Sequence, residues 1–179
     1  MESTATHALD LAVREIERHV ATGGWDGPVR VFALVRTADA LADQPGLAAQ
    51  LEPEVVAAAA EDPFHLLSVE QEGLPAAADL EELLAALSWP STVHGAAVVV
   101  ERLMLPPAAQ EAMPADPQAA VEYLMSHPER QDVRIAVGVL RDGPTWCLVR
   151  SRAHDEDAAV AGGPDLVPGL VEAVGATLA

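Results

Sequence analysis

The chain begins with a segment in which apolar residues recur at every third or fourth position. These residues are Leu9, Val13, Ile16 and Val20. This spacing places apolar side chains on one face of a helix. Gly23 and Gly24 follow where the helix should end, because glycine adopts the left-handed cap at low cost. A second set of apolar residues at similar spacing predicts a C-terminal helix. The set consists of Leu166, Leu170, Val174 and Leu178, and Pro168 lies in the first turn of this helix.

Five further segments carry the alternating or continuous apolar pattern of β-strands. They span residues 29–36, 64–72, 93–105, 132–140 and 145–152. The last two flank "RDGP", and Asp-Gly between two alternating runs predicts a β-hairpin with antiparallel pairing. Between the strands, residues 37–62 are alanine-rich and should be helical in pieces, broken at Pro45 and Pro53.

Two more helices are predicted from their start signals. Asp79 and Glu82 have the spacing of a capping box at the start of the leucine-rich run in residues 78–87. Asp116 and Pro117 mark the start of the other helix, and its buried face should be formed by Val121, Leu124 and Met125.

This order of elements predicts an α+β fold. Strands and helices do not alternate strictly, and the hairpin requires antiparallel pairing. We therefore expect a mainly antiparallel sheet of about five strands, with helices packed on one face and a C-terminal helix. No internal repeat or linker divides the sequence, so residues 1–179 should form a single domain.

Charge narrows the range of partners. The chain has 28 acidic and 10 basic residues, a net charge of -18, and no lysine among the basic ones. Phosphate backbones and anionic membrane surfaces attract basic proteins and would repel this one. We therefore expect no nucleic-acid or membrane binding, and a partner, if any, with a basic face. Self-association as a homodimer is the other possibility.

The sequence contains no recognisable catalytic motif. No phosphate-binding glycine loop, His-Glu-x-x-His motif or nucleophile elbow occurs, and without lysine no Schiff-base chemistry is possible. The single Cys147 excludes an intramolecular disulfide or a thiolate-rich zinc site. The first residues lack the pattern of a signal peptide, and no apolar stretch reaches transmembrane length. We expect a cytoplasmic protein without cofactor, bound metal or catalytic residue.

The densest polar cluster lies in "AHDED", residues 153–157. It fails the calcium-loop pattern, because Ala159 and Val160 stand where an oxygen ligand and a glycine are needed. Asp155 could instead cap a short helix that ends at Gly162, with Glu156 and Asp157 in its first turn. The cluster is therefore either a helix cap or part of a binding site.

Arginines beside this cluster are the other candidates. Arg150 and Arg152 share one face of their predicted strand, and Arg134 should lie opposite them in the hairpin. Their guanidinium groups could bind an anion or pair with carboxylates, with Arg152 and Asp155 as an obvious local pair. The candidate ligand or partner surface consists of Arg134, Arg150, Arg152, His154, Asp155 and Asp157.

Several longer segments resemble one known family. They read "GWDGPVRVFALVRTADALA", "EQEGLP", "WPSTVHGAAVVVERLMLPP", "VRIAVGVLRDG" and "HDEDAAVAGGPDLVPGLVEA". Together they are similar to a family of small acidic proteins of high-GC Gram-positive, actinobacterial-type bacteria, for which no activity is known. The resemblance covers nearly the whole chain and implies no cofactor or catalytic residue.

Three functional hypotheses remain open. The first is a non-catalytic interaction or adaptor-like module, favoured by the charge and by the lack of catalytic motifs. The second is a small-molecule or metal-dependent enzyme or binder that uses the region from Arg150 to Asp157. The third is an inactive relative of an α+β enzyme.

Overall fold

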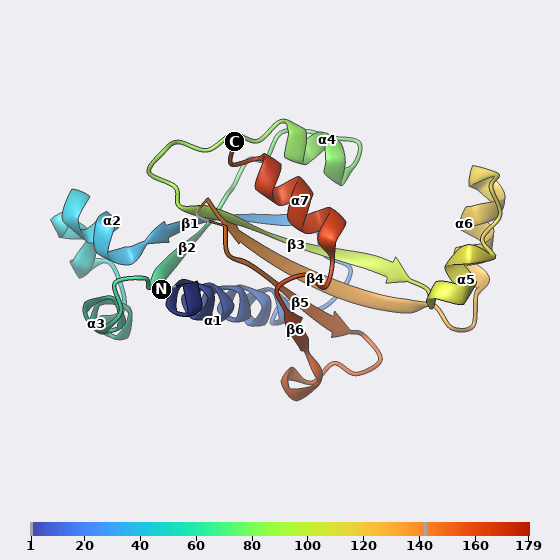
Figure 1. Cartoon of the computed structure of the whole chain (residues 1–179), viewed down its shortest axis with the longest axis horizontal. Coiled ribbons are helices and arrows are strands. Elements are labelled where there is room, and N and C mark those ends of the chain that lie inside the picture. Colours follow the sequence, from blue (N-terminus) through green and yellow to red (C-terminus); the bar gives the residue numbers. More distant parts are fainter. Residues whose placement is uncertain (1, 142) are drawn as a thin grey trace.

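The computed structural model describes residues 2–141 and 143–179 and contains one antiparallel sheet with helices around it (Figure 1). Its helices are α1 (Glu2–Ala21), α2 (Thr37–Asp43), α3 (Pro53–Glu61), α4 (Leu80–Ala85), α5 (Pro107–Glu111), α6 (Pro117–Ser126) and α7 (Pro168–Ala176), with short 3-10 helices η1 (Pro45–Ala49) and η2 (Asp157–Ala159). Its strands are β1 (Arg30–Arg36), β2 (Leu66–Glu70), β3 (Gly95–Met104), β4 (Gln131–Leu140), β5 (Thr145–Ser151) and β6 (Ala161–Gly163).

The sheet confirms the predicted α+β class and all five predicted strands. Its six strands are ordered β2-β1-β3-β4-β5-β6, and every neighbouring pair is antiparallel. The sixth, β6, lies where the sequence suggested only a glycine stop. The β4–β5 hairpin is confirmed, although Asp142 in its turn lies outside the described residues.

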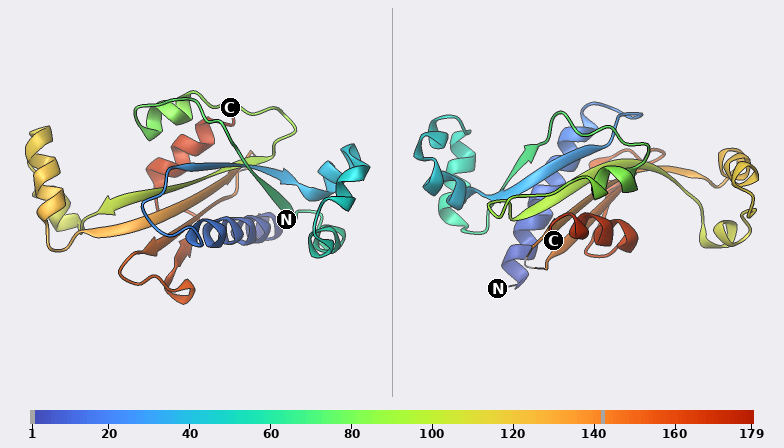
Figure 2. Two further views of the ribbon diagram at one scale, coloured as in Figure 1. Left: turned by 180° about the vertical axis from the view of Figure 1, so that it is seen from behind. Right: turned by 90° about the horizontal axis from the view of Figure 1, so that it is seen from above.

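Helices cover both faces of this sheet, so the expectation of helices on one face is wrong (Figure 2). Helix α1 packs on one face against residues such as Phe32, Leu34 and Val99. Helices α4 and α7 pack on the other face against Val31, Val98 and others. Adjacent residues of the central strands are therefore both buried, which explains their continuous apolar runs.

Several local predictions are confirmed. Asp79 caps α4, since its side chain accepts a hydrogen bond of 2.8 Å from the Glu82 N–H. Asp116 caps α6 in the same way, through a 3.0 Å bond from the Ala119 N–H. In α7, Leu170 and Val174 are buried, whereas Leu166 precedes the helix and is exposed.

The predicted buried face of α6 is wrong. Val121 is 61% exposed and Met125 is 53% exposed. The β3–β4 ladder ends at the pair of Met104 and Gln131, and the chain between them extends past the end of the sheet (Figure 1). Helix α6 therefore packs against α5, to which Tyr123 donates a hydrogen bond at Ala109 O, and its apolar side chains do not reach the core.

Among the described residues, no helix combines the length and apolar character needed to cross a membrane.

Candidate functional site

The predicted arginine cluster forms on the face of the sheet that α1 covers. Arg134 in β4 lies directly opposite Arg150 in β5, as the sequence suggested. Both residues are almost fully buried, at 1% and 2% exposure. Glu17 of α1, itself buried, accepts hydrogen bonds from Nε and Nη2 of Arg150, the second at 2.8 Å. A buried carboxylate on the helix thus neutralises an arginine in the sheet.

Arg134 is held mainly by the loop that follows α1. Its Nη2 donates to Gly24 O and, at 3.4 Å, to Glu101 Oε1, and its Cζ lies 4.4 Å from the centre of the Trp25 ring. The face of an indole ring attracts a guanidinium. Its Nη1 is 3.9 Å from Glu17 Oε1, beyond hydrogen-bond length. The buried carboxylate of Glu17 is therefore hydrogen-bonded to Arg150 and lies within ion-pair distance of Arg134.

Acidic residues from the segment after β5 complete the cluster. Asp155 accepts hydrogen bonds from Trp25 Nε1 at 2.9 Å and from Arg150 Nη1 at 3.1 Å. Asp157 accepts from Arg150 Nη2 at 2.6 Å. Arg150 therefore uses donors on all three of its nitrogens within the protein.

Three expectations about this segment need correction. Helix η2 begins after Glu156, whose side chain makes no cap hydrogen bond, so Asp155 does not cap it. Gly162 belongs to strand β6 and does not end a helix. Arg152 pairs with Asp26, at 2.9 and 3.0 Å, instead of Asp155. The segment folds back on the sheet, where the buried Arg150 guanidinium attracts the carboxylates of Asp155 and Asp157. Arg152 is instead exposed and faces the loop after α1, which carries Asp26.

The cluster contains four of the six predicted site residues: Arg134, Arg150, Asp155 and Asp157. Arg152 lies at its border, with its Cζ 5.5 Å from the centre of the Trp25 ring. His154 is set apart, since it is exposed and pairs through its backbone with Ser151. The charges of Arg150 and Asp155 are engaged within the protein, so a ligand would have to displace an existing partner. Across the described ranges, no group of three histidine, cysteine or acidic side chains is arranged to hold a metal ion. A ligand or partner at these residues stays a prediction.

Ion pairing shifts the titration of the cluster. The Trp25 indole N–H, and then the Arg150 guanidinium, lower the pKa of Asp155. The hydrogen bond from Arg150 lowers the pKa of Asp157, and the one from Arg152 lowers that of Asp26. The hydrogen bond to Glu17 raises the pKa of Arg150 most, and the bonds to Asp157 and Asp155 raise it further.

The lowered pKa of Asp157 predicts a pH-dependent contribution to stability. A carboxyl group whose pKa is lower in the folded state stabilises the fold above its ordinary pKa of about 3.9, and this stabilisation is lost as the pH falls through the folded-state pKa. Asp157→Asn should therefore lower the melting temperature at neutral pH. The difference from the wild type should shrink below about pH 4 and vanish in stronger acid. A difference that stays constant across a melting series at fixed ionic strength would contradict the assignment.

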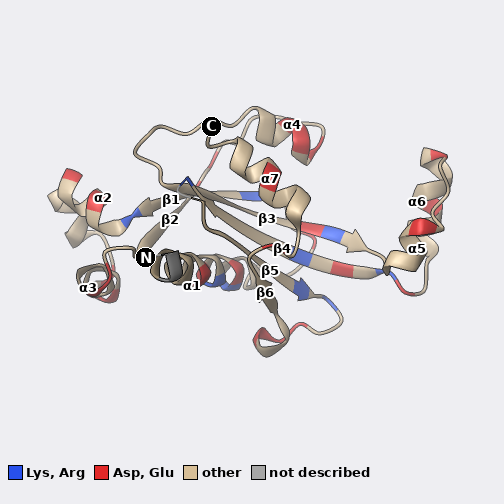
Figure 3. Cartoon of the chain, in the orientation of Figure 1, with Lys and Arg blue, Asp and Glu red and all other residues tan. Residues whose placement is uncertain are grey.

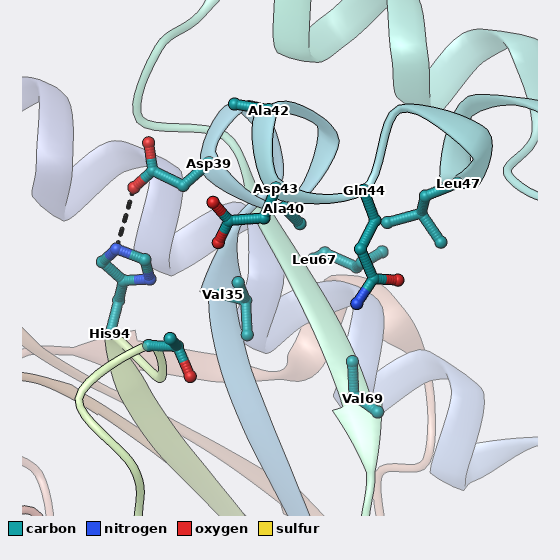
Figure 4. Close-up of a pocket in the computed structure, with 11 residues that line it drawn as sticks. Val35, Asp39, Ala40, Ala42, Asp43, Gln44, Leu47, Leu67, Val69 and His94 are labelled. Carbon is teal, nitrogen blue, oxygen red and sulfur yellow. Dashed lines mark ion pairs between the residues drawn. The ribbon is translucent and has the colours of Figure 1, made fainter.

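A second candidate site, which the sequence did not reveal, is a groove on the opposite face of the sheet (Figure 4). It has a volume of about 720 Å³, and its floor is formed by Val35 of β1 with Leu67 and Val69 of β2. The side chains of Val35 and Leu67 are neighbours because these residues pair directly in the sheet. The floor is therefore a short apolar strip near the edge of the sheet.

The walls of the groove are polar and acidic. Helix α2 contributes Asp39 and Asp43, both exposed, and Gln44 and Leu47 follow it (Figure 4). Asp39 and Asp43 are four residues apart and so lie on the same side of the helix. Figure 3 shows these acidic positions on α2 at the end of the sheet opposite α5 and α6. The groove therefore joins an apolar floor to an acidic rim.

His94 fixes the position of α2 over the sheet. Its Nδ1 accepts a 3.1 Å hydrogen bond from the Arg36 N–H, so in the neutral ring the hydrogen lies on Nε2. Nε2 is 2.9 Å from Asp39 Oδ2 and donates to it (Figure 4). Both ring nitrogens are engaged, so His94 is arranged to hold Asp39 in place and not to accept a proton from a ligand.

The signal for this groove in the sequence was faint. "TADALAD", residues 37–43, contains two aspartates four apart, but only the folding of α2 over β1 and β2 places them beside an apolar strip. His94 is far away in sequence and reaches Asp39 only because β3 pairs with β1.

Comparison with known proteins identifies a family. A family model described as PPA1309-like protein matches residues 9–179. No curated protein and no solved structure matches the chain. The family description names no activity, in agreement with the resemblance seen in the sequence, while its bacterial source stays a prediction. A function has to be argued from the groove and the charge cluster themselves.

Proposed function

The chain belongs to the PPA1309-like protein family, and we propose that it is a non-catalytic interaction module that binds an arginine- or lysine-containing segment of a partner protein in the groove beside α2. The observation that carries this proposal is the combination of an apolar floor with two exposed carboxylates on one wall.

Such a groove suits a long basic side chain, which has an apolar stem and a charged end. Arginine and lysine have apolar methylene stems and charged ends. A stem can lie on Val35, Leu67 and Val69 while the charged end reaches Asp39 or Asp43. An acidic ligand would be repelled by the same carboxylates. A purely apolar ligand would give the exposed carboxylate of Asp43 no partner, whereas Asp39 already pairs with His94.

The charge of the whole chain favours the same class of partner. A net charge of -18 draws a basic segment towards the surface and repels nucleic acids. This long-range attraction raises the rate of association more than the final affinity. Binding should therefore weaken as salt screens the charges, since the screening length falls to about 3 Å at about 1 M.

The geometry of the polar groups supports binding over catalysis. Both ring nitrogens of His94 are used within the protein, and Arg150 on the other face is surrounded by its own carboxylates. General acid–base catalysis needs a side chain that can exchange a proton with a substrate. His94 is not placed to do so.

A short basic peptide tests the proposal. We expect a fluorescein-labelled heptapeptide, Arg-Val-Arg-Val-Arg-Val-Arg, to bind the wild-type protein in an anisotropy titration at low salt. Asp39→Asn combined with Asp43→Asn should weaken binding roughly tenfold, because each exposed ion pair is worth about 0.2–1 kcal/mol.

A matched control removes the same charge from the other end of the molecule. Glu111→Gln combined with Glu122→Gln also changes the net charge by two, but these residues lie on α5 and α6. This variant should bind the peptide nearly as well as the wild type. Equal loss in both double variants would show that the overall charge, and not the groove, holds the peptide. No binding at all by the wild type would reject the proposal.

A further inference from the structure

We infer that the basic segment binds as an additional β-strand, paired through its backbone with the open edge of β2. This inference rests on the proposed function and specifies how the partner would lie. Within the part of the chain that the structure describes, strand β2 ends the sheet on this side, since its one neighbour in the strand order is β1. A strand at a sheet edge presents one row of backbone N–H and C=O groups that its neighbour does not use.

The register shows which groups face the open edge. Thr37 N donates to His65 O, and Gln71 N donates to Val31 O, so the bonded pairs between the strands include Thr37 with His65 and Val31 with Gln71. Bonded and non-bonded pairs alternate along an antiparallel ladder. The residues between these pairs that also bond to β1 are Leu67 and Val69. The backbone groups of Leu66, Ser68 and Glu70 therefore point away from β1.

The same alternation connects the edge to the groove. Leu67 and Val69 pair with β1 and send their side chains to the groove floor, where Val69 remains 44% exposed. A strand added beside β2 would lie about 4.8 Å away, with every second side chain on the groove side. Arginine is long enough to reach from there over Val69 towards α2. Backbone pairing would supply affinity, and the acidic rim would select the side chain.

The other edge of the sheet lacks these features. Strand β6 has only three residues, two of them glycine, and Pro164 follows directly. Short strands and proline are common devices that prevent pairing at an edge. Strand β2 is longer, contains neither proline nor lysine, and has an exposed valine. Only β2 combines an open edge with a neighbouring groove.

Charge argues for a foreign segment over a second copy of the chain. Pairing two copies through β2 would bring together two molecules that each carry a net charge of -18. Antiparallel pairing centred on Ser68 would also place the carboxylates of α2 in both copies near the same junction. A basic partner strand gains from the same charges.

Amide hydrogen exchange measured by NMR tests the inference directly, with the heptapeptide Arg-Val-Arg-Val-Arg-Val-Arg at saturation. Exchange at Ser68 and Glu70 should slow roughly tenfold or more when the peptide binds, because their N–H groups gain backbone partners. The peptide with every interior amide N-methylated should bind roughly tenfold or more weakly, since it cannot donate.

The outcomes separate the two proposals. If the peptide binds while exchange at Ser68 and Glu70 is unchanged, or if the N-methylated peptide binds equally well, strand addition is wrong and the groove proposal stands. If the unmodified peptide does not bind, both are wrong. If the protein alone forms dimers that protect Ser68, a second copy occupies the edge and the inference is wrong.

Discussion

Glu17→Gln should lower the free energy of unfolding by about 3 kcal/mol, which is a large part of the stability of a typical domain. The amide keeps the shape of the side chain but removes the only buried carboxylate near Arg134 and Arg150 that the described residues provide. Breaking a buried ion pair costs about 3–5 kcal/mol because the remaining charge stays in the interior. We expect the lower value, since Asp155 and Asp157 still contact Arg150.

The matched control for this change is Glu15→Gln on the same helix. Glu15 is exposed, and a surface substitution of this kind usually changes stability by less than about 0.5 kcal/mol. Urea unfolding followed by circular dichroism measures both values. Equal small effects in the two variants would show that the buried cluster contributes nothing to stability.

Gly138→Ala should also destabilise the protein, by about 1–3 kcal/mol. Gly138 lies on β4 under α1, and a Cβ atom there would come within 2.5 Å of Val13 Cγ2 and 2.9 Å of Leu9 Cδ1. Both side chains are fully buried in the core between α1 and the sheet. Valine is restricted in its rotamers, so α1 itself would have to move away from the sheet.

Gly175→Ala adds the same methyl group but should have the opposite effect on stability. Gly175 lies in α7, where a Cβ atom would come no closer than 3.7 Å, to Val139 Cγ1. Alanine is favoured over glycine inside a helix by about 0.5–1 kcal/mol, so this variant should be more stable than the wild type. Thermal unfolding of the two variants should shift in opposite directions. A Gly138→Ala variant as stable as the wild type would mean that α1 does not pack closely on β4.

The five longer strands and the pairing of β4 with β5 could be predicted because they depend on local signals. The alternation in residues 132–140 and 145–152, with a turn between them, is enough to place Arg134 opposite Arg150. The sequence also indicated pairing with carboxylates as one of two possibilities for these arginines, beside anion binding. It did not indicate Glu17, which is brought to Arg150 by the packing of α1 and lies 133 residues away in the chain.

The remaining features depend on how elements meet in space. The apolar positions of α6 match a buried helix, but β3 and β4 carry that helix beyond the sheet, where Val121 stays exposed. Adjacent apolar residues such as Val98 and Val99 fit a strand buried on both faces, but the run does not reveal which helices cover each face. The groove needs α2, β2 and His94 together, and no single segment encodes that arrangement.

The arginine cluster and the groove differ in the burial of their charged side chains. In the cluster, the guanidinium groups are buried and paired with carboxylates from α1 and the segment after β5. In the groove, the carboxylates of Asp39 and Asp43 are exposed, and Asp39 is also held in position by His94. The buried, paired guanidinium groups stabilise the fold, whereas exposed carboxylates beside an apolar strip can be reached by a partner. This difference is why we assign binding to the groove.

Chemical-shift mapping tests that assignment most directly. The unlabelled heptapeptide Arg-Val-Arg-Val-Arg-Val-Arg is added to ¹⁵N-labelled protein, and backbone and indole N–H signals are followed. We expect the largest changes in chemical shift at Val35, Asp39 and Leu67, while the signal of the Trp25 indole N–H, which is bonded to Asp155, stays in place. The largest changes at Trp25 and Asp155, with Asp39 unaffected, would contradict this assignment and place the binding surface at the arginine cluster.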